Sequence, residues 1–130
     1  MGTPPGLGRI GQLALEVGDL EAAVAFYRDR LGLPHLFTTP SPNAMAFFDC
    51  AGIRLLLGQH EDEPAGRSGS IIYFAVEGIE DSHRALAEAA VEFMQVPAKV
   101  ADLGETELWL AFFRDPWSNT LALMEERPVG

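Results

Sequence analysis

The stretch IGQLALEVGDLEAAVAFYRDRLGLP, residues 10–34, decides the class of this fold. Apolar side chains alternate with other residues over 10–17, which predicts a strand whose two faces differ. Asp19 then offers an N-cap oxygen, and apolar residues recur at helical spacing after it. Gly32 follows the periodic stretch, as is typical of a helix C-terminus. The sequence therefore predicts a strand followed by an amphipathic helix over 21–31.

The rest of the chain repeats this plan. Further strands are predicted at residues 35–39, 44–50, 53–57, 71–76, 99–103, 107–114 and 120–125, and a second helix over 79–93. The order of elements is βαβββ, a polar stretch, and βαβββ again. We therefore expect a single domain over 1–130, with a first module at about 9–58, a linker at 59–69 and a second module at about 70–126.

The two predicted modules also match each other in sequence. Residues 17–21 match 76–80 at an offset of 59, residues 46–48 match 111–113 at 65, and residues 53–55 match 121–123 at 68. An offset that grows along the chain requires only small insertions in loops. Three matches in the same order indicate a duplicated supersecondary unit.

The duplication predicts where a ligand would bind. The expected fold class is α+β, with two tandem βαβββ modules forming a curved, partly closed eight-stranded sheet and the helices on the outside. Such a sheet encloses a trough, and concave sites between modules commonly bind small molecules. If the apolar face of the first strand packs beneath its helix, Gln12, Ala14 and Glu16 point into the trough.

Composition limits the kinds of partner. The 130 residues are 48% hydrophobic, but no apolar stretch reaches the roughly 18 residues of a membrane span. The 19 acidic and 9 basic residues give a formal charge of −10, which would repel nucleic-acid phosphates. Cys50 is the single cysteine, which excludes an intrachain disulfide. Because the chain starts without a secretory pattern, we expect a cytoplasmic protein that binds neither nucleic acid nor membranes.

Three motifs resemble those of one family. They are Val17-Gly18-Asp19-Leu20, FYRDRLGL at 26–33 and FRDPWSN at 113–119. The glyoxalase / bleomycin-resistance / dioxygenase (vicinal oxygen chelate) superfamily has, roughly, V-x-D-L, F-Y-x-x-x-L-G-L and F-x-D-P-D-G-N at these places. The chain resembles this family over nearly its whole length, although Trp117-Ser118 replaces Asp-Gly in the last motif. The resemblance implies the duplicated fold and a homodimer.

The resemblance also implies where a divalent metal would be bound. Metal-dependent members hold it with four side chains from the first and last strands of each module, and substrate oxygens occupy the remaining positions. Residue by residue, these positions fall on Gln12, Arg54, Ile71 and Ala122. Gln12 could ligate a hard cation, but Ile71 and Ala122 have no lone pairs and Arg54 is a permanent cation. We therefore expect no metal and no other cofactor, which argues against catalysis.

Other reactive side chains form no recognisable site in the sequence. His35, His60 and His83 lack the close spacing of a metal-binding pair. Cys50 has no His or Lys beside it to lower its pKa, so we expect a small buried residue and not a nucleophile. Phosphate-binding, dinucleotide and nucleophile-elbow motifs do not occur.

Two hypotheses of function follow. The first is a glyoxalase/bleomycin-resistance-like protein that binds a small, partly apolar molecule in the trough without a metal. Its predicted ligand-binding residues are Gln12, Glu16, Arg54, Ile71, Tyr73, Trp109, Ala122 and Met124. Trp109 would form a stacking wall, and Arg54 would pair with Glu16 or an anionic ligand, because burying an arginine alone is costly. Alternatively, the apolar members fill a closed core, or the protein is a metal-dependent lyase, isomerase or dioxygenase with unconventional ligands.

Overall fold

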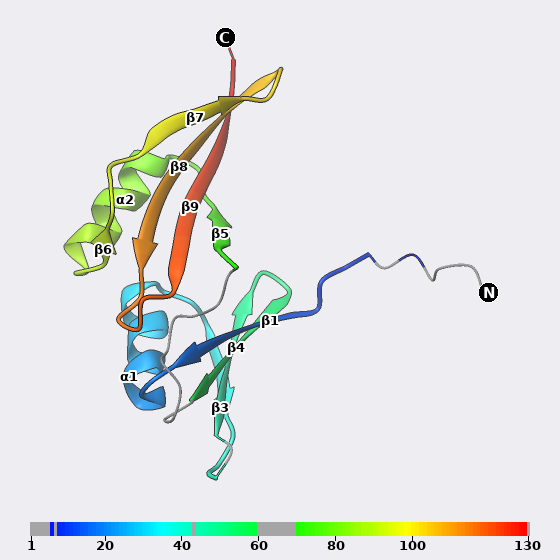
Figure 1. Ribbon diagram of the computed structural model, residues 1–130, viewed down its shortest axis with the longest axis vertical. Coiled ribbons are helices and arrows are strands. Elements are labelled where there is room, and N and C mark those ends of the chain that lie inside the picture. Colours follow the sequence, from blue (N-terminus) through cyan, green and yellow to red (C-terminus); the bar gives the residue numbers. More distant parts are fainter. Residues whose placement is uncertain (1–5, 7, 43, 60–69, 130) are drawn as a thin grey trace.

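The computed structural model describes residues 6, 8–42, 44–59 and 70–129, and in it the strands form two sheets (Figure 1). The first module comprises β1 (Gln12–Val17), α1 (Leu20–Ala25), its π-helical continuation η1 (Phe26–Arg30), β2 (His35–Thr38), β3 (Met45–Cys50) and β4 (Ile53–Gln59). Its strands are ordered β1-β4-β3-β2. β1 runs parallel to β4, and the other neighbours are antiparallel.

The second module repeats this topology. It comprises β5 (Ile72–Ala75), α2 (Ile79–Glu88), β6 (Glu92–Phe93), β7 (Ala98–Asp102), β8 (Thr106–Arg114) and β9 (Thr120–Pro128). β5 runs parallel to β9, β9 pairs antiparallel with β8, and both β6 and β7 pair with β8. The short strands β6 and β7 together therefore occupy the place that β2 has in the first module.

The strand register tests the internal matches of the sequence. Phe48 lies opposite Leu55 in the first sheet, and Phe113 lies opposite Leu121 in the second, which confirms the offset of 65 residues for this strand. The same pairs set the offset between the last strands at 66 residues, from Leu55 to Leu121, so the predicted offset of 68 is wrong. A slip of two residues keeps every side chain on its predicted face, which is why alternation alone did not reveal it.

The second helix is shorter than predicted. It was expected over 79–93 but ends at Glu88. Ala90 has a φ of 66°, in the left-handed region, which stops the helical path, and Phe93 lies in β6. Among the described residues, no helix is long and apolar enough to cross a membrane.

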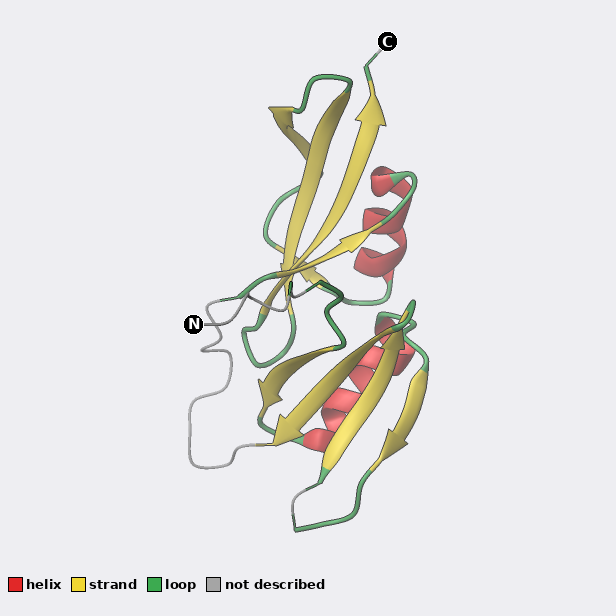
Figure 2. Cartoon of the chain, turned by 90° about the vertical axis from the view of Figure 1, so that its right-hand side faces the viewer, coloured by secondary structure: helices red, strands yellow, loops and turns green. Residues whose placement is uncertain are grey.

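The prediction of one curved eight-stranded sheet is wrong. The described strands form separate sheets of four and five strands, each with its helix on one face (Figure 1). In Figure 2 the first sheet lies in front of α1, and no helix or strand lies in front of its other face. Side chains, and not strand pairing, join the modules, because one hydrophobic core includes residues of both.

A buried polar cluster connects the turn after β8 with the first module. The hydroxyl of Tyr27, a fully buried residue, donates to Asp115 Oδ2 at 2.8 Å. Asp115 Oδ1 accepts the backbone N–H groups of Trp117 and Asn119 at 2.9 and 2.8 Å. Asn119 Nδ2 donates to Asp115 Oδ2 at 2.8 Å and to the backbone carbonyl of Glu16 at 2.9 Å. Burial, and then the Asp115 carboxylate, raise the pKa of Tyr27, so its hydroxyl stays a donor.

Candidate functional site

The face of the first sheet opposite α1 carries three of the predicted site residues. Leu15 and Val17 are buried beneath the helix, so strand alternation turns Gln12 and Glu16 to the other side. Arg54 lies directly opposite Gln12 and shares that side. The first open face, as we call it, consists of Gln12, Ala14, Glu16, Phe37, Phe47, Asp49, Arg54 and Leu56.

The corresponding face of the second sheet carries four more. Tyr73 and Phe112 flank Ala122 across the sheet, and the two ring centroids are 6.1 Å apart. The side chains of Ile71 and Tyr73 are 39% and 44% exposed, so these two do not fill a closed core. The second open face consists of Ile71, Tyr73, Leu110, Phe112, Ala122 and Met124. The predicted residues therefore lie in two groups on separate sheets, where a single trough was expected.

Trp109 lies on the other side of its sheet. It shares its face with Ala111 and Phe113, which belong to the core, and it packs against that core. Its indole N–H donates to Glu107 at 3.5 Å, and the Arg127 guanidinium lies 4.4 Å from its ring centroid. The predicted stacking wall is thus wrong. Alternation separates two faces of a strand but does not say which one the helix covers.

The predicted ion pair between Glu16 and Arg54 does not form. Arg54 lies opposite Gln12, and Glu16 is four residues further along β1, which corresponds to about 13 Å. The Arg54 guanidinium instead lies over the ring of Phe47, with its central carbon 5.1 Å from the ring centroid. This is the geometry of a cation–π contact.

The four positions at which the resemblance implies metal ligands do not fit a divalent cation. Gln12 and Arg54 are neighbours in the first sheet, but only the amide of Gln12 offers an oxygen ligand. The register makes Leu56, and not Arg54, the counterpart of Ala122, and Leu56 has no donor atom either. Ile71 and Ala122 also lack donor atoms, so the four implied positions provide one metal ligand in all. Within the described ranges, no three His, Cys, Asp or Glu side chains are grouped to hold a metal ion.

The histidines and the cysteine are placed as ordinary structural residues. A ring nitrogen of His35 is hydrogen-bonded to the Thr38 hydroxyl at 2.8 Å, and the His83 ring packs edge-on to Phe93 at 4.3 Å. His60 lies outside the described residues. Burial, and then the charge of Asp49, raise the pKa of the Cys50 thiol, which disfavours the thiolate.

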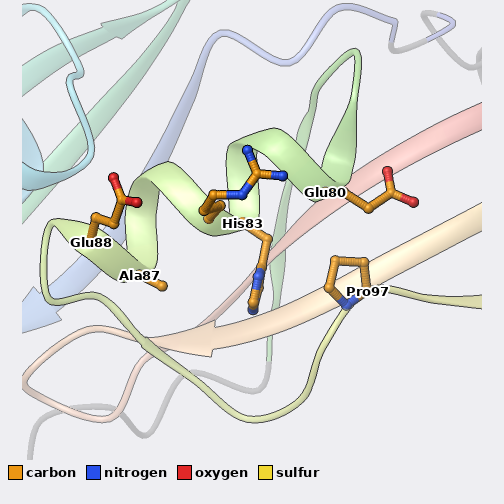
Figure 3. A pocket seen from close by; sticks show the side chains of 6 residues that line it. Glu80, His83, Ala87, Glu88 and Pro97 are labelled. Carbon is orange, nitrogen blue, oxygen red and sulfur yellow. The ribbon is translucent and has the colours of Figure 1, made fainter.

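A groove of about 490 Å³ lies on the outer side of α2 (Figure 3). Four helical residues and Pro97, from the segment between β6 and β7, are labelled around it. Two of its charged residues are already engaged, since Glu80 pairs with Arg127 and Arg84 pairs with Asp81 at 3.0 Å. Four of its six lining residues are Glu, His or Arg, so its residue composition differs from that of a typical small-molecule site, which is lined mainly by apolar and aromatic side chains.

Sequence reasoning missed the aromatic part of the first open face. The rings of Phe37 and Phe47 are 4.7 Å apart with an interplanar angle of 31°, and Phe47 lies opposite Leu56. The repeated Ala-Phe-Phe sequence contained the signal. Its first and third residues are buried under the helix in both modules, which leaves the middle phenylalanine for the open face.

Comparisons with known proteins agree with this architecture. The family model described as "Glyoxalase/Bleomycin resistance protein/Dioxygenase superfamily" matches residues 9–123. A member of that superfamily from Sphaerobacter thermophilus is 22% identical, with a TM-score of 0.77 over 92% of this chain and 98% of that chain. A glyoxalase family protein from Enterococcus faecalis is 24% identical, with a TM-score of 0.75 over 90% of this chain and 97% of the other.

A protein from Nocardioides described as a glyoxalase/bleomycin resistance protein/dioxygenase is 22% identical, with a TM-score of 0.73 over 98% of this chain and 89% of that chain. No curated protein matches the sequence. At these identities the solved structures establish the fold alone, whereas the family model spans most of the chain. The chain therefore belongs to the Glyoxalase/Bleomycin resistance protein/Dioxygenase superfamily.

Proposed function

We propose that this protein binds a small, partly apolar molecule on its open sheet faces, without a divalent metal. The observation that carries the proposal is the composition of these faces. They are mainly apolar and aromatic, with an amide at Gln12, carboxylates at Glu16 and Asp49, a guanidinium at Arg54 and a phenol at Tyr73. A few polar groups on an apolar surface are typical of small-molecule sites.

The donor chemistry supports the metal-free part of the proposal. A divalent cation bound by Gln12 would lie close to the guanidinium of Arg54, which faces Gln12 across the sheet. Two positive charges about 4 Å apart repel by about 4 kcal/mol per unit-charge pair at an effective dielectric of 20. One neutral amide does not offset this cost. The two implied positions in the second module, Ile71 and Ala122, add no donor atom.

Metal analysis tests this part directly. Purified full-length protein should carry no stoichiometric metal, and nickel, zinc, manganese and iron should leave its melting temperature unchanged. The Gln12→Ala variant serves as the control, because it removes the only oxygen donor among the four implied positions. A stoichiometric metal that raises the melting temperature by several degrees, and is lost in Gln12→Ala, would establish the alternative, a metal-dependent lyase, isomerase or dioxygenase.

A fragment screen followed by heteronuclear NMR tests the binding itself. Small aromatic and aliphatic fragments should shift the backbone signals of Arg54, Phe47 or Tyr73, while those of α2 stay in place. Shifts confined to Glu80, His83 and their neighbours would move the site to the groove on α2. A screen without hits at millimolar concentration would contradict the proposal.

We also propose that two copies of the chain associate. Ile71 and Tyr73, which lie together on the second open face, are 39% and 44% exposed. Exposed apolar side chains gathered on one surface are typical of an interaction site. Size-exclusion chromatography with light scattering should give twice the chain mass of 14.1 kDa. A monomer at micromolar concentration would overturn the proposed dimer and leave the proposed ligand binding unaffected.

A further inference from the structure

The first open face contains a cation without an anionic partner. Among the described residues, no carboxylate lies within ion-pair distance of Arg54, which instead contacts the ring of Phe47. The Asp49 side chain comes from the residue directly opposite Arg54, but its Oδ1 accepts the N–H of Gly52 at 2.9 Å. Four other basic side chains of this acidic chain pair with carboxylates, namely Arg28, Arg84, Lys99 and Arg127. Arg30 resembles Arg54, because it lies over a phenylalanine ring and is in no ion pair among the described residues. Arg54 is therefore available to an anion from outside.

The surroundings of Arg54 say what else such an anion must carry. Phe37, Phe47, Arg54 and Leu56 form a continuous surface, which we call the Phe47 patch. The Phe37 ring is 47% exposed and stacks on Phe47. Phe47 itself is only 9% exposed, so the accessible ring beside the cation is that of Phe37. The patch therefore suits a planar apolar group with an acidic substituent.

The cation–π contact leaves the guanidinium able to bind that substituent. The contact with Phe47 is electrostatic and uses no hydrogen bond, so the N–H groups of Arg54 can donate two parallel hydrogen bonds to a ligand. A carboxylate accepts these bonds in a planar fork. A dianion such as phosphate is disfavoured, because the Asp49 carboxylate is adjacent and the chain has a formal charge of −10.

We propose that the Phe47 patch binds a small aromatic or planar apolar monocarboxylate. The carboxylate binds the Arg54 guanidinium, and the apolar body packs against Phe37 and Leu56. This inference rests on the proposed function and specifies its ligand class. It implies that the local cation at Arg54, and not the formal charge of −10 of the whole chain, decides the charge of the ligand.

Three probes with the same ring test the inference. 2-Naphthoate, 2-naphthylmethanol and 2-naphthylmethylammonium differ in charge, and their affinities for the full chain are measured by heteronuclear NMR titration. Naphthoate should bind about tenfold or more tightly than the alcohol, since a charge-assisted bidentate pair is replaced by one neutral hydrogen bond. The ammonium should bind no better than the alcohol.

Variants then assign the preference to Arg54. Arg54→Gln should lower the affinity for naphthoate about tenfold and leave the affinity for the alcohol unchanged, with a spectrum that remains folded. Arg84→Gln removes the same charge from the exposed face of α2 and should change neither affinity. Asp49→Asn keeps the acceptor for Gly52 but removes the negative charge beside Arg54, and should tighten naphthoate binding a few-fold.

The outcomes separate the inference from the proposed function. Equal binding of naphthoate and the alcohol, tighter binding of the ammonium, or an Arg54→Gln variant that keeps full affinity would overturn the inference while the face remains a binding site. If other fragments bind and none of the three naphthyl probes does, the inference alone fails. If no probe and no fragment binds, both fail.

Discussion

The two modules share one strand topology, yet their helices begin in different ways. In the first module, Asp19 caps α1 by accepting the N–H of Ala22 at 3.2 Å. Gln59, at the end of β4, adds an amide oxygen that accepts the N–H of Leu20 at 2.9 Å. The first helix therefore has a local cap and a second one from the neighbouring strand.

In the second module, only the neighbouring strand β9 caps the helix. Gly78 has no side chain to cap α2, and Glu125 of β9 accepts the N–H groups of both Gly78 and Ile79, at 2.6 and 3.1 Å. Its carboxylate also accepts from Arg127 at 2.9 Å. The duplicated fold therefore preserves the position of the capping side chain on the last strand of each module. The residue there differs, because α1 also has a local cap and needs only an amide, whereas α2 has no local cap and receives a carboxylate. A carboxylate at this end of a helix is also favoured by the helix dipole.

The hydrogen bond that connects the two modules is also not duplicated. Tyr27 of the first helix meets Asp115 in the turn of the second module. At the repeat offsets of 59 and 65, the corresponding positions are Leu86 and Cys50, which cannot form such a bond. The four predictions that follow test this difference between the modules and are ordered by the size of the expected effect.

Asp115→Ala should have the largest effect. It leaves the Tyr27 hydroxyl and the N–H groups of Trp117 and Asn119 without their buried acceptor. We expect a loss of about 3 to 5 kcal/mol in the free energy of unfolding, measured in urea. Cys50→Ala, at the corresponding turn, should lose far less. A loss below 1 kcal/mol for Asp115→Ala would mean that the polar cluster does not hold the modules together.

Glu125→Ala should cost about 2 kcal/mol at pH 7, because two N–H groups of α2 lose their acceptor. The bonds from Gly78 and Ile79, and then Arg127, lower the pKa of Glu125 below its ordinary 4.5. Since the folded pKa is the lower one, this stabilisation is present above about pH 4.5 and is lost as the pH falls through the folded pKa. The difference from wild type should therefore shrink in acid.

The matched variant in the first module is Gln59→Ala. It removes one hydrogen bond of a helix that keeps Asp19, so its cost should be smaller and should not depend on pH in this way. Urea unfolding of both variants between pH 3 and pH 7 makes the comparison. Equal costs, or a Glu125→Ala difference that grows in acid, would contradict the assignment of the caps.

Gly18→Ala should cost about 1 kcal/mol, because an added Cβ would lie 2.9 Å from Trp117 Cδ1 and Nε1 and force the indole to move. The corresponding residue of the second module is Glu77, so close approach is needed on one side only. In a Trp117→Ala background the same substitution should cost almost nothing. Thermal unfolding of the wild type, the two single variants and the double variant gives the coupling free energy between the two positions. If the costs of the two substitutions simply add, the contact with Trp117 is not the cause of the loss.

Arg54→Gln should change the free energy of unfolding least, by no more than about 0.5 kcal/mol. The side chain is exposed and has no ion-pair partner among the described residues, so folding gains little from it. Its loss should appear in ligand affinity instead. A large loss of stability would make Arg54 a structural residue and remove it from the candidate site.

Much of the fold was predictable because it depends on local periodicity. The alternation over β1 and the helical spacing after Asp19 correctly identified a strand and an amphipathic helix, and the duplicated order of elements was confirmed by the strand pairing. For the candidate site, seven of the eight predicted residues lie on the open faces. Trp109 does not, because a period of two residues is the same for either face of a strand.

Local periodicity could not predict contacts between segments that are distant in the sequence. Tyr27 and Asp115 are separated by 88 residues, and neither has a local pattern that indicates the other. The offset between the last strands was wrong by two residues for the same reason, since only the pairing of Leu55 and Leu121 with their neighbours sets it.

The order of the residues alone thus determined the family, the repeated unit and the lack of metal-binding side chains at the expected positions. These depend on residue types and spacings that are visible along the chain. Tertiary packing decided that the strands divide into two sheets, which face of each sheet its helix covers, and that Arg54 lies over Phe47 and not beside Glu16. The physical reason is that hydrophobic burial is non-directional, so the choice of face and partner is made only when separate segments compete for the same core.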